Sequence, residues 1–530
     1  MSESDLPVVR MAHGRWGDPA RETHLPAAAL DALRHLGARP MPPAAPAPEL
    51  PAPADALVTA LAAIVGAAQV KTDSETRWRH TRGYSTPDLL RDRAGDTTDA
   101  PDLVVLPGSH DEVQALLTAC TELGVAVVPY AGGTSVVGGL APDRQGYDAV
   151  VAVDLARLDQ VIEVDEISRT ATLQAGLRGP AAEAELAARG FTLGHFPQSY
   201  EGASIGGYAA TRSSGQSSAG FGRFDQMVVG LTVATPRGTI QLGRAPHSAA
   251  GPDLRQLFLG SEGAFGILTS VVVRIRPRAT ERVFEGWRFP TFETGLDAVR
   301  RLAQDGPLPT VLRLSDEAET AINLADPDVL GSGGPGGCVA ICGFEGSRIG
   351  TRRAEVAEVL QAAGGEPLGE GPGETWRRGR YNAPYLRDPL LDEGALVETL
   401  ETAGFWSALP GLKAAVTEAL VKALSDQGTP PVVLCHISHV YETGASLYFT
   451  VLCAQTEDPI AQWARAKQAA CDAIGRTGGT ITHHHAVGTD HRPGYEAEIG
   501  PLAIEVLQAV KSVLDPARTM NPGILIPPPS

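Results

Sequence analysis

Three consecutive histidines, His483, His484 and His485, are the side chains of this sequence best suited to chemistry. The chain has 13 histidines in 530 residues, so the run is a local concentration. Imidazole titrates near neutrality and can transfer a proton, bind an anion or ligate a metal. On a strand, neighbouring side chains point to opposite faces, so His483 and His485 could share a ligand sphere but His484 could not. Asp490 and His491 follow, but no carboxylate or cysteine stands at a ligand-like spacing, and we expect no metal.

Three further side chains could take part in such chemistry. Tyr441, taken alone, is typical of an ordinary core or surface aromatic. Arg387 precedes Asp388 and could be half of a surface ion pair. Arg313 lies between apolar residues on a predicted strand, where an unpaired guanidinium is costly, so we expect a ligand or an acidic partner there.

Loops rich in glycine and hydroxyl groups occur at three places, in 129–135, 198–215 and 262–268. Glycine permits positive φ and lets a ligand approach the backbone, and consecutive N–H groups form a concavity that suits pyrophosphate. One such loop is as often an ordinary tight turn, but three indicate a large dinucleotide. No GxGxxG joins the first strand to its helix, so NAD fits poorly.

The elements that must position these loops begin with a β-α-β unit. Strands are predicted at 103–106 and 125–129, around a helix over 110–123 that starts in a Ser109/Asp111 cap region. More strands and a helix (179–189) follow, with a hairpin across 226–243 and a strand at 267–275. Residues 77–83 mix basic and aromatic side chains and predict a solvated basic loop.

A second region with alternating strands and helices is predicted after about residue 280. Its helices are expected at 292–305, 350–363, 410–426 and 458–476, with a last helix at about 500–513. Its strands are expected at 284–289, 309–315, 337–343, 396–399, 431–440 and 446–454.

Composition excludes several classes of function. Lys+Arg is 44 and Asp+Glu is 62, giving a net charge of −18, which argues against a nucleic-acid partner and against electrostatic adhesion to anionic lipid. Six cysteines without a CxxC pair predict reduced core residues in a cytoplasmic protein. No apolar run reaches transmembrane length, and residues 1–10 are polar, so neither a membrane span nor a signal peptide is expected.

A family resemblance joins these motifs. From about residue 77 to its end, the chain resembles the FAD-binding oxidoreductases of the vanillyl-alcohol oxidase / p-cresol methylhydroxylase type. Tyr441 with its neighbours and the histidine run resemble the alkyldihydroxyacetonephosphate synthase (alkylglycerone-phosphate synthase) branch. The segments that carry the resemblance are 129–135, 194–207, 235–238, 260–266, 440–449 and the three histidines.

The resemblance implies an α+β fold. A two-subdomain FAD-binding domain is expected at 99–279, and a substrate (cap) domain with an antiparallel sheet at 280–498. Residues 1–98 would form an irregular and helical segment with a proline-rich linker, and 499–530 would return to the FAD domain. A homodimer with peripheral membrane contact is also expected.

The resemblance also implies a chemistry. Such enzymes exchange the acyl group of acyl-dihydroxyacetone phosphate, a lipid substrate, for a long-chain alcohol through an adduct at flavin N5, without net redox turnover. Tyr441 would be the acid/base, the three histidines would line the site, Arg313 would support activity and Arg387 would bind substrate phosphate. FAD, held non-covalently, would contact Pro129, Tyr130, Ala131, Gly132, Gly133, Thr134, Ser135, Gln198, Ser199, Ala203, Ser204, Gly207, Thr211, Ser214, Glu262, Gly263, Gly266, Ile267, Leu268 and Asn521.

Some residues depart from the family pattern. Gln198 replaces an acidic residue and Glu442 an aspartate, and the tail Asn521–Gly523 is similar to flavin-dependent D-lactate or glycolate dehydrogenases. A D-2-hydroxyacid dehydrogenase or oxidase is therefore the alternative, and a flavin-binding protein without turnover is a third possibility.

Overall fold

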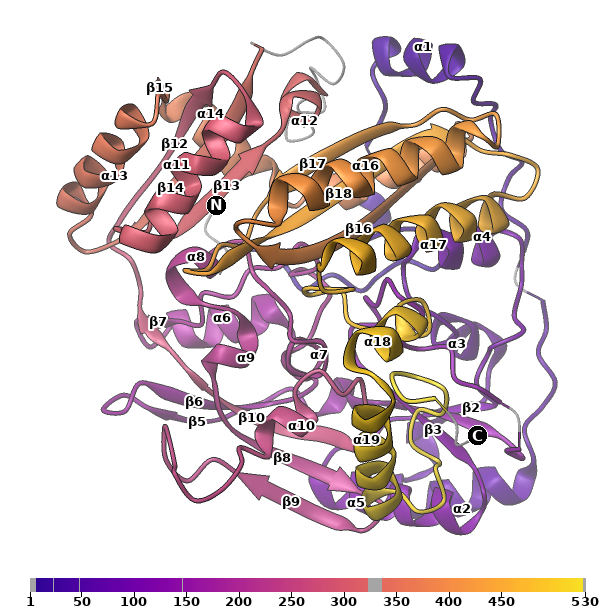
Figure 1. The fold of residues 1–530 in the computed structure, drawn as a ribbon. Helices are drawn as coiled ribbons and strands as arrows, with labels where there is room; N and C mark the ends of the chain where they lie inside the picture. Colours follow the sequence, from indigo (N-terminus) through magenta and orange to yellow (C-terminus); the bar gives the residue numbers. More distant parts are fainter. Residues whose placement is uncertain (1–5, 22, 47, 145, 323–335, 528–530) are drawn as a thin grey trace.

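The computed structural model describes residues 6–21, 23–46, 48–144, 146–322 and 336–527. Figure 1 shows a lower domain, built mainly from residues 55–277, and an upper domain, built from 281–322 and 336–477. Residues 501–527 return to the lower domain. None of the described helices is long and apolar enough to cross a bilayer.

The first sheet of the lower domain has the strand order β1-β2-β4-β3. These strands are Val70–Lys71, Leu103–Val105, Val150–Asp154 and Ala126–Tyr130, and the last three run parallel. Helices α2 (Asp55–Val65) and α5 (His110–Glu122) pack on this sheet. Ser109 caps α5 by accepting from the N–H of Glu112 at 3.1 Å. Valine-rich strands suit a parallel sheet buried on both faces.

The second sheet of the lower domain is antiparallel, with the order β5-β6-β10-β8-β9. Its strands are Val161–Asp165, Thr170–Gln174, Ile267–Arg274, Val228–Thr235 and Gly238–Leu242. Short helices α6 (Gly179–Ala187), α7 (Ile205–Thr211), α8 (Ser218–Phe221) and α9 (Phe224–Met227) lie between β6 and β8 along the chain. The loops that connect them face the upper domain (Figure 1).

The upper domain contains a seven-stranded antiparallel sheet of order β15-β12-β14-β13-β17-β18-β16. The strands are Glu366–Gly369, Glu281–Phe289, Cys338–Gly346, Val311–Ser315, Val432–Ile437, Gly444–Ala454 and Ala395–Phe405. One face packs on α11 (Phe292–Asp305), α13 (Gly350–Ala362), α16 (Leu409–Ser425) and α17 (Pro459–Thr477). Strand β13 shows the alternation: Leu312 and Leu314 enter this core, while Arg313 and Ser315 face the other way.

The opposite face of this sheet carries α12 (Glu317–Ile322), α14 (Glu370–Gly379) and α15 (Ala383–Asp392), and it looks toward the lower domain. The two domains thus meet where this sheet face, which carries both polar and aliphatic side chains, lies opposite the glycine-rich loops. All six cysteines are free, and five of them are buried.

Residues 77–83 are not the solvated loop that was predicted. Helix α3 (Ser74–Arg79) includes Arg77, whose guanidinium is buried and donates to the carbonyls of Pro101 and Pro51 at 2.8 and 2.7 Å. Arg82 is also buried and is paired with Asp92 at 3.1 Å. Internal acceptors, which a local pattern of basic residues does not reveal, offset the desolvation of both cations.

Residues 492–527 close the lower domain. Helices α18 (Arg492–Ile499) and α19 (Pro501–Leu514) lead to an extended tail in which Met520 bridges to Val127 of β3. The N–H of Asn521 donates to the carbonyl of Val127 at 2.8 Å. At the opposite edge of the first sheet, β1 pairs with β2, and α2 packs on the same sheet. The predicted boundary at residue 98 therefore falls inside this structural unit.

Residues 9–21, which we call the strap, cross the junction between the domains. Val9 donates its N–H to the carbonyl of Glu201 in the lower domain at 3.0 Å. Trp16 donates its N–H to Asp388 of α15 in the upper domain at 2.7 Å. Gly17 has φ +69°, and a Cβ there would lie 2.4 Å from the ring of Tyr385, so only glycine fits. The strap therefore fixes α15 against the lower domain.

Candidate active site

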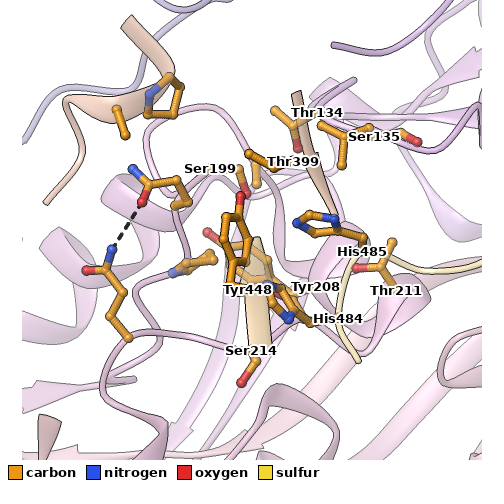
Figure 2. Close-up of a pocket in the computed structure, with 18 of the residues that line it drawn as sticks. Thr134, Ser135, Ser199, Tyr208, Thr211, Ser214, Thr399, Tyr448, His484 and His485 are labelled. Atoms are coloured by element: carbon orange, nitrogen blue, oxygen red, sulfur yellow. Dashed lines mark hydrogen bonds between the residues drawn. The ribbon is translucent and has the colours of Figure 1, made fainter. Parts of the chain in front are cut away.

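A cavity of about 880 Å³ lies between the loops of the lower domain and the sheet of the upper domain. This volume is near the upper end of the range for small-molecule sites, roughly 300–1,000 Å³. Every residue predicted to contact FAD lines this cavity except Asn521. Figure 2 shows Thr134, Ser135 and Ser199 around one end, with Tyr448, His484 and His485 at the centre.

The loop that follows β3 offers free backbone donors to this cavity. Within the described part of the chain, the N–H groups from Ala131 to Ser135 donate to no protein acceptor. A Cβ on Gly132 would lie 2.6 Å from the carbonyl oxygen of Gly202, and Gly133 has φ +67°. Arg178 ties the two loops together by donating to the Ala131 carbonyl at 2.8 Å and to the Gly202 carbonyl. Such a concavity of unpaired donors fits a pyrophosphate.

Glu262 and Asn521 act as scaffold. The buried Glu262 carboxylate accepts from the N–H groups of Val487 and Gly488, each at 2.9 Å, so it holds the segment that follows the histidines. Burial raises the pKa of Glu262 to about 7 even though these two donors oppose the shift. Asn521 donates to the carbonyls of Glu262 and Gly139 at 2.6 and 3.2 Å, behind the cavity wall.

The three histidines lie in a bent turn and not on a strand. The buried Glu401 of β16 accepts from the N–H groups of all three, at 2.7, 3.1 and 2.9 Å, and from the hydroxyl of Thr482 at 2.6 Å. Burial would raise the pKa of Glu401, but the adjacent imidazoles and the Thr482 hydroxyl keep it well below its usual range. A single carboxylate therefore sets the path of the whole turn.

This turn overturns the expectation that adjacent histidines point apart. The Nδ1 atoms of His483 and His484 lie 2.9 Å from each other. His484 and His485 line the cavity, whereas His483 lies one layer behind it. Burial lowers the pKa of each of the three, so all are neutral at pH 7.

Tyr441 lies behind the wall with His483. It follows β17 in a tight connection to β18, and its hydroxyl lies 2.6 Å from Nε2 of His483. Burial raises the pKa of Tyr441 to about 12, so the phenol stays protonated at pH 7. A hydrogen-bonded chain therefore runs from Tyr441 through His483 to His484 at the cavity.

Three residues outside the predicted site complete this wall: His436, His439 and Tyr448. His439 stacks on His483, with ring centroids 5.1 Å apart, and its Nδ1 lies 2.6 Å from the Ser218 hydroxyl. Tyr448 stacks on His436 at 4.8 Å and lies beside His484 (Figure 2). The strands that hold them were predictable: His436 lies on β17, His439 just after it and Tyr448 on β18. The pairing that brings them to the histidine turn was not predictable.

Arg313 has the acidic partner that its apolar setting predicted. Its guanidinium lies 2.6 Å from the Glu319 carboxylate and 2.9 Å from Nδ1 of His436. Burial would raise the pKa of Glu319, but His436 and Arg313 lower it to about 2. Arg313 therefore lines the cavity as part of a closed network, with its charge balanced inside the protein.

Arg387 differs from Arg313 because it has no hydrogen-bonded acceptor among the described residues, although its charge opposes the rise in pKa that burial causes at Asp388 and Glu398. It lies on α15 and lines the cavity, and its Nε is buried with no hydrogen-bond partner among the described residues. Asp388, the neighbour expected to pair with it on a surface, is buried and bound to Arg93 at 2.7 Å and to the strap. A buried guanidinium donor without an acceptor suits an anionic ligand.

Next to Arg387 the cavity is apolar. Its walls there come from α14, α15 and the end of β15, through Leu368, Pro372, Trp376, Pro384, Leu386 and Leu390. Val339 and Ile341 of β14 and Val397 of β16 add aliphatic surface. This arm can hold a hydrocarbon chain, whereas the glycine loops, the histidine wall and Arg387 offer polar groups.

Comparisons with known proteins agree with this arrangement. The family model described as FAD binding domain matches residues 101–242, and that of FAD linked oxidases, C-terminal domain, matches 278–525. An alkyldihydroxyacetonephosphate synthase of Dictyostelium discoideum is 35% identical over 483 residues, which cover 87% of this chain and 79% of that protein.

Solved structures extend the similarity to the fold. An alkyldihydroxyacetonephosphate synthase structure superposes with a TM-score of 0.82 at 30% identity, over 97% of both chains. A p-cresol methylhydroxylase structure has a TM-score of 0.71 at 16% identity and shares the fold. A mitochondrial D-lactate dehydrogenase of Arabidopsis thaliana is more distant, at 27% identity over 447 residues. The predicted fold class and FAD cofactor are confirmed, and the chain belongs to the alkyldihydroxyacetonephosphate synthase family of FAD-dependent enzymes.

Proposed function

We propose that this enzyme replaces the acyl group of acyl-dihydroxyacetone phosphate with a long-chain alcohol. The observation that carries the proposal is Arg387, a cavity arginine whose buried Nε has no acceptor among the described residues, on α15, which also forms part of the apolar arm. A ligand that satisfies both features has an anionic head and a hydrocarbon tail. A short hydroxy acid would leave the apolar arm empty.

The chain's own groups account for binding and proton transfer. FAD, when bound against the loops 129–135, 198–214 and 262–268, supplies the electron-pair chemistry for exchange at C1 without net oxidation. Arg387 binds the phosphate and orients C1 toward the histidine wall. His484 exchanges a proton at that wall, and His483 and Tyr441 relay it, because the three groups are linked at 2.9 and 2.6 Å.

An exchange assay tests the proposal. Purified holoprotein is incubated with acyl-dihydroxyacetone phosphate and a labelled fatty alcohol, and labelled ether product is expected to appear with one fatty acid released per turnover. The flavin band should stay oxidised when D-lactate, glycolate or 2-hydroxyglutarate is mixed in anaerobically. Prompt bleaching by one of these acids, without ether formation, would establish the dehydrogenase alternative.

We further propose that the protein is a cytoplasmic homodimer. It would contact a membrane surface, take up its lipid substrate there and make an ether lipid precursor. The apolar arm supports a lipid substrate, and the resemblance supports the dimer. Sedimentation equilibrium and flotation with uncharged phosphatidylcholine vesicles test the two statements separately. A monomer at micromolar concentration, or protein that stays out of the vesicle fraction, would contradict the corresponding one.

A further inference from the structure

Three histidine rings from two segments converge at the cavity wall: His439 after β17, and His483 and His484 from the turn. One ring nitrogen from each lies within 4.8 Å of the other two. We propose that these three side chains form a binding site for a zinc-class divalent ion. Imidazole is the preferred ligand of such ions, and three protein ligands with one open position are the usual set at zinc sites that exchange their fourth ligand.

The spacing matches what a tetrahedral ion requires. A Zn–N bond of about 2.0–2.1 Å places ligand nitrogens roughly 3.3 Å apart. The Nδ1 atoms of His483 and His484 are 2.9 Å apart, and the wider separations in the cluster need inward movement of no more than about 1.5 Å. Small rotations of the rings provide that movement while the backbone of the turn stays on Glu401.

Hydrogen bonds to residues outside the cluster orient two of the three rings. Nδ1 of His439 lies 2.6 and 3.0 Å from the hydroxyls of Ser218 and Ser214, which leaves its Nε2 for the ion. Nε2 of His483 lies 2.6 Å from the hydroxyl of Tyr441, which leaves its Nδ1. Such outer partners fix the tautomer and the ring plane of metal-ligating histidines. Binding needs only a shift of tautomer, in which His483 donates to the Tyr441 oxygen.

The charge of the surroundings also fits a cation. Glu401 is fully buried, and its carboxylate lies 3.6 Å from Nδ1 of His484, so a buried negative charge stands directly behind the ligands. Arg223 is a nearby opposing charge, and it shares the Asp225 carboxylate with Arg212, each at 3.1 Å. The Glu401 carboxylate therefore offsets part of the positive charge that the ion would bring.

The ion would block the reaction. His439 and His484 line the cavity, so the open coordination position faces the substrate. An ion there holds the ring nitrogens that exchange protons and places a positive charge beside the flavin site. This inhibitory role rests on the proposed function, whereas the binding site itself does not.

Cobalt substitution tests the site directly on holoprotein freed of metal by a chelator. Co²⁺ alone should bind at one ion per chain and give the visible bands of tetrahedral coordination, and Zn²⁺ should displace it. His439→Gln should weaken binding at least 100-fold. Ser218→Ala keeps all three ligands and should weaken binding about 10-fold, in line with the loss of an outer partner. His35→Gln, a change on the exposed surface of α1, is the matched control and should bind as wild type.

Each outcome decides the proposal. No stoichiometric Co²⁺ binding, or binding unchanged in both His439→Gln and Ser218→Ala, would overturn the site. Flavin absorbance and circular dichroism confirm that each variant is folded. Zn²⁺ should abolish exchange in the wild type and a chelator should restore it, and exchange that persists with the site filled would overturn the inhibitory role. A protein that shows no exchange at all would refute the proposed function, while the cobalt spectrum would still report on the site.

Discussion

Replacing Glu401 with glutamine, a side chain of nearly the same size, should displace the histidine turn. The Oε1 atom accepts from the Thr482 hydroxyl and the N–H groups of His484 and His485, and Oε2 accepts from the N–H of His483 at 2.7 Å. A glutamine oxygen at Oε1 keeps three of these bonds, but its NH₂ group would face the His483 N–H. Two donors would then oppose each other in a buried place.

The magnitude follows from these contacts. The unsatisfied N–H costs about 1–3 kcal/mol, and each remaining bond loses roughly 1 kcal/mol when its acceptor becomes neutral. The sum, about 4–6 kcal/mol, is larger than the turn can absorb without moving. A displacement of about 1 Å at a catalytic wall lowers the rate on the order of 100-fold. We therefore expect kcat for the exchange reaction to fall about 100-fold, with KM within threefold because Arg387 is untouched.

The assay compares wild type, Glu401→Gln and the control Glu442→Gln, in which the altered side chain is exposed. Flavin content and absorbance should be the same in all three. The pKa of Glu401 is held well below its usual range in the folded protein. Its contribution to folding stability is therefore fully present above the unfolded-state pKa and is lost only as pH falls through the lower folded-state pKa. The ratio of wild-type to variant kcat should therefore be constant from pH 6 to 9. A variant kcat within threefold of wild type, or a ratio that disappears near neutrality, would refute the reasoning.

Three further predictions concern single side chains. Arg387→Met should raise KM for the phosphate substrate about 100-fold and leave the flavin spectrum unchanged, and an unchanged KM would show that the phosphate binds elsewhere. Tyr441→Phe removes the end of the relay and should lower kcat about 10²-fold at constant KM, as measured by steady-state exchange. Burial raises the pKa of Glu262 to about 7 in the folded protein, against 4.5 for the free group. The pH dependence of stability is therefore opposite to that from Glu401. The wild type loses about 3 kcal/mol of stability as pH rises from 4.5 to 7. Glu262→Gln should flatten this slope in denaturant unfolding between pH 5 and 8, and parallel curves for the two proteins would contradict the burial argument.

Local patterns predicted three glycine-rich loops that the structure brings to one cavity. The conformation of such a loop depends mainly on its own glycine and hydroxyl residues, so it can be predicted locally. The loops 129–135, 198–214 and 262–268 all reach the same cavity. The helix predicted at 292–305 is α11, because an apolar stripe and the Thr291 cap determine it within one segment. For the same reason the hairpin across 226–243 was predictable from its turn.

Features that depend on distant partners were not predictable. The strand assumption for the histidines was wrong because Glu401, 82 residues away, imposes a bent turn. Tyr448 joins the wall because β18 pairs with β17. His439 joins it because its ring contacts the hydroxyls of Ser214 and Ser218 in the lower domain. Asn521 was predicted as a cofactor contact from its motif, yet its amide serves the backbone of two neighbouring loops.

The strap has a consequence for how the protein is made. Trp16 and its partner Asp388 are 372 residues apart in sequence. At a synthesis rate of about 5–20 residues per second, roughly 20–75 s pass before the growing chain can offer that partner. During this interval the strap cannot dock on the upper domain, and α15, which carries Arg387, is absent. Completion of the phosphate-binding corner is thus a late event in biogenesis, and a nascent chain arrested before residue 388 would expose the strap to proteases and chaperones.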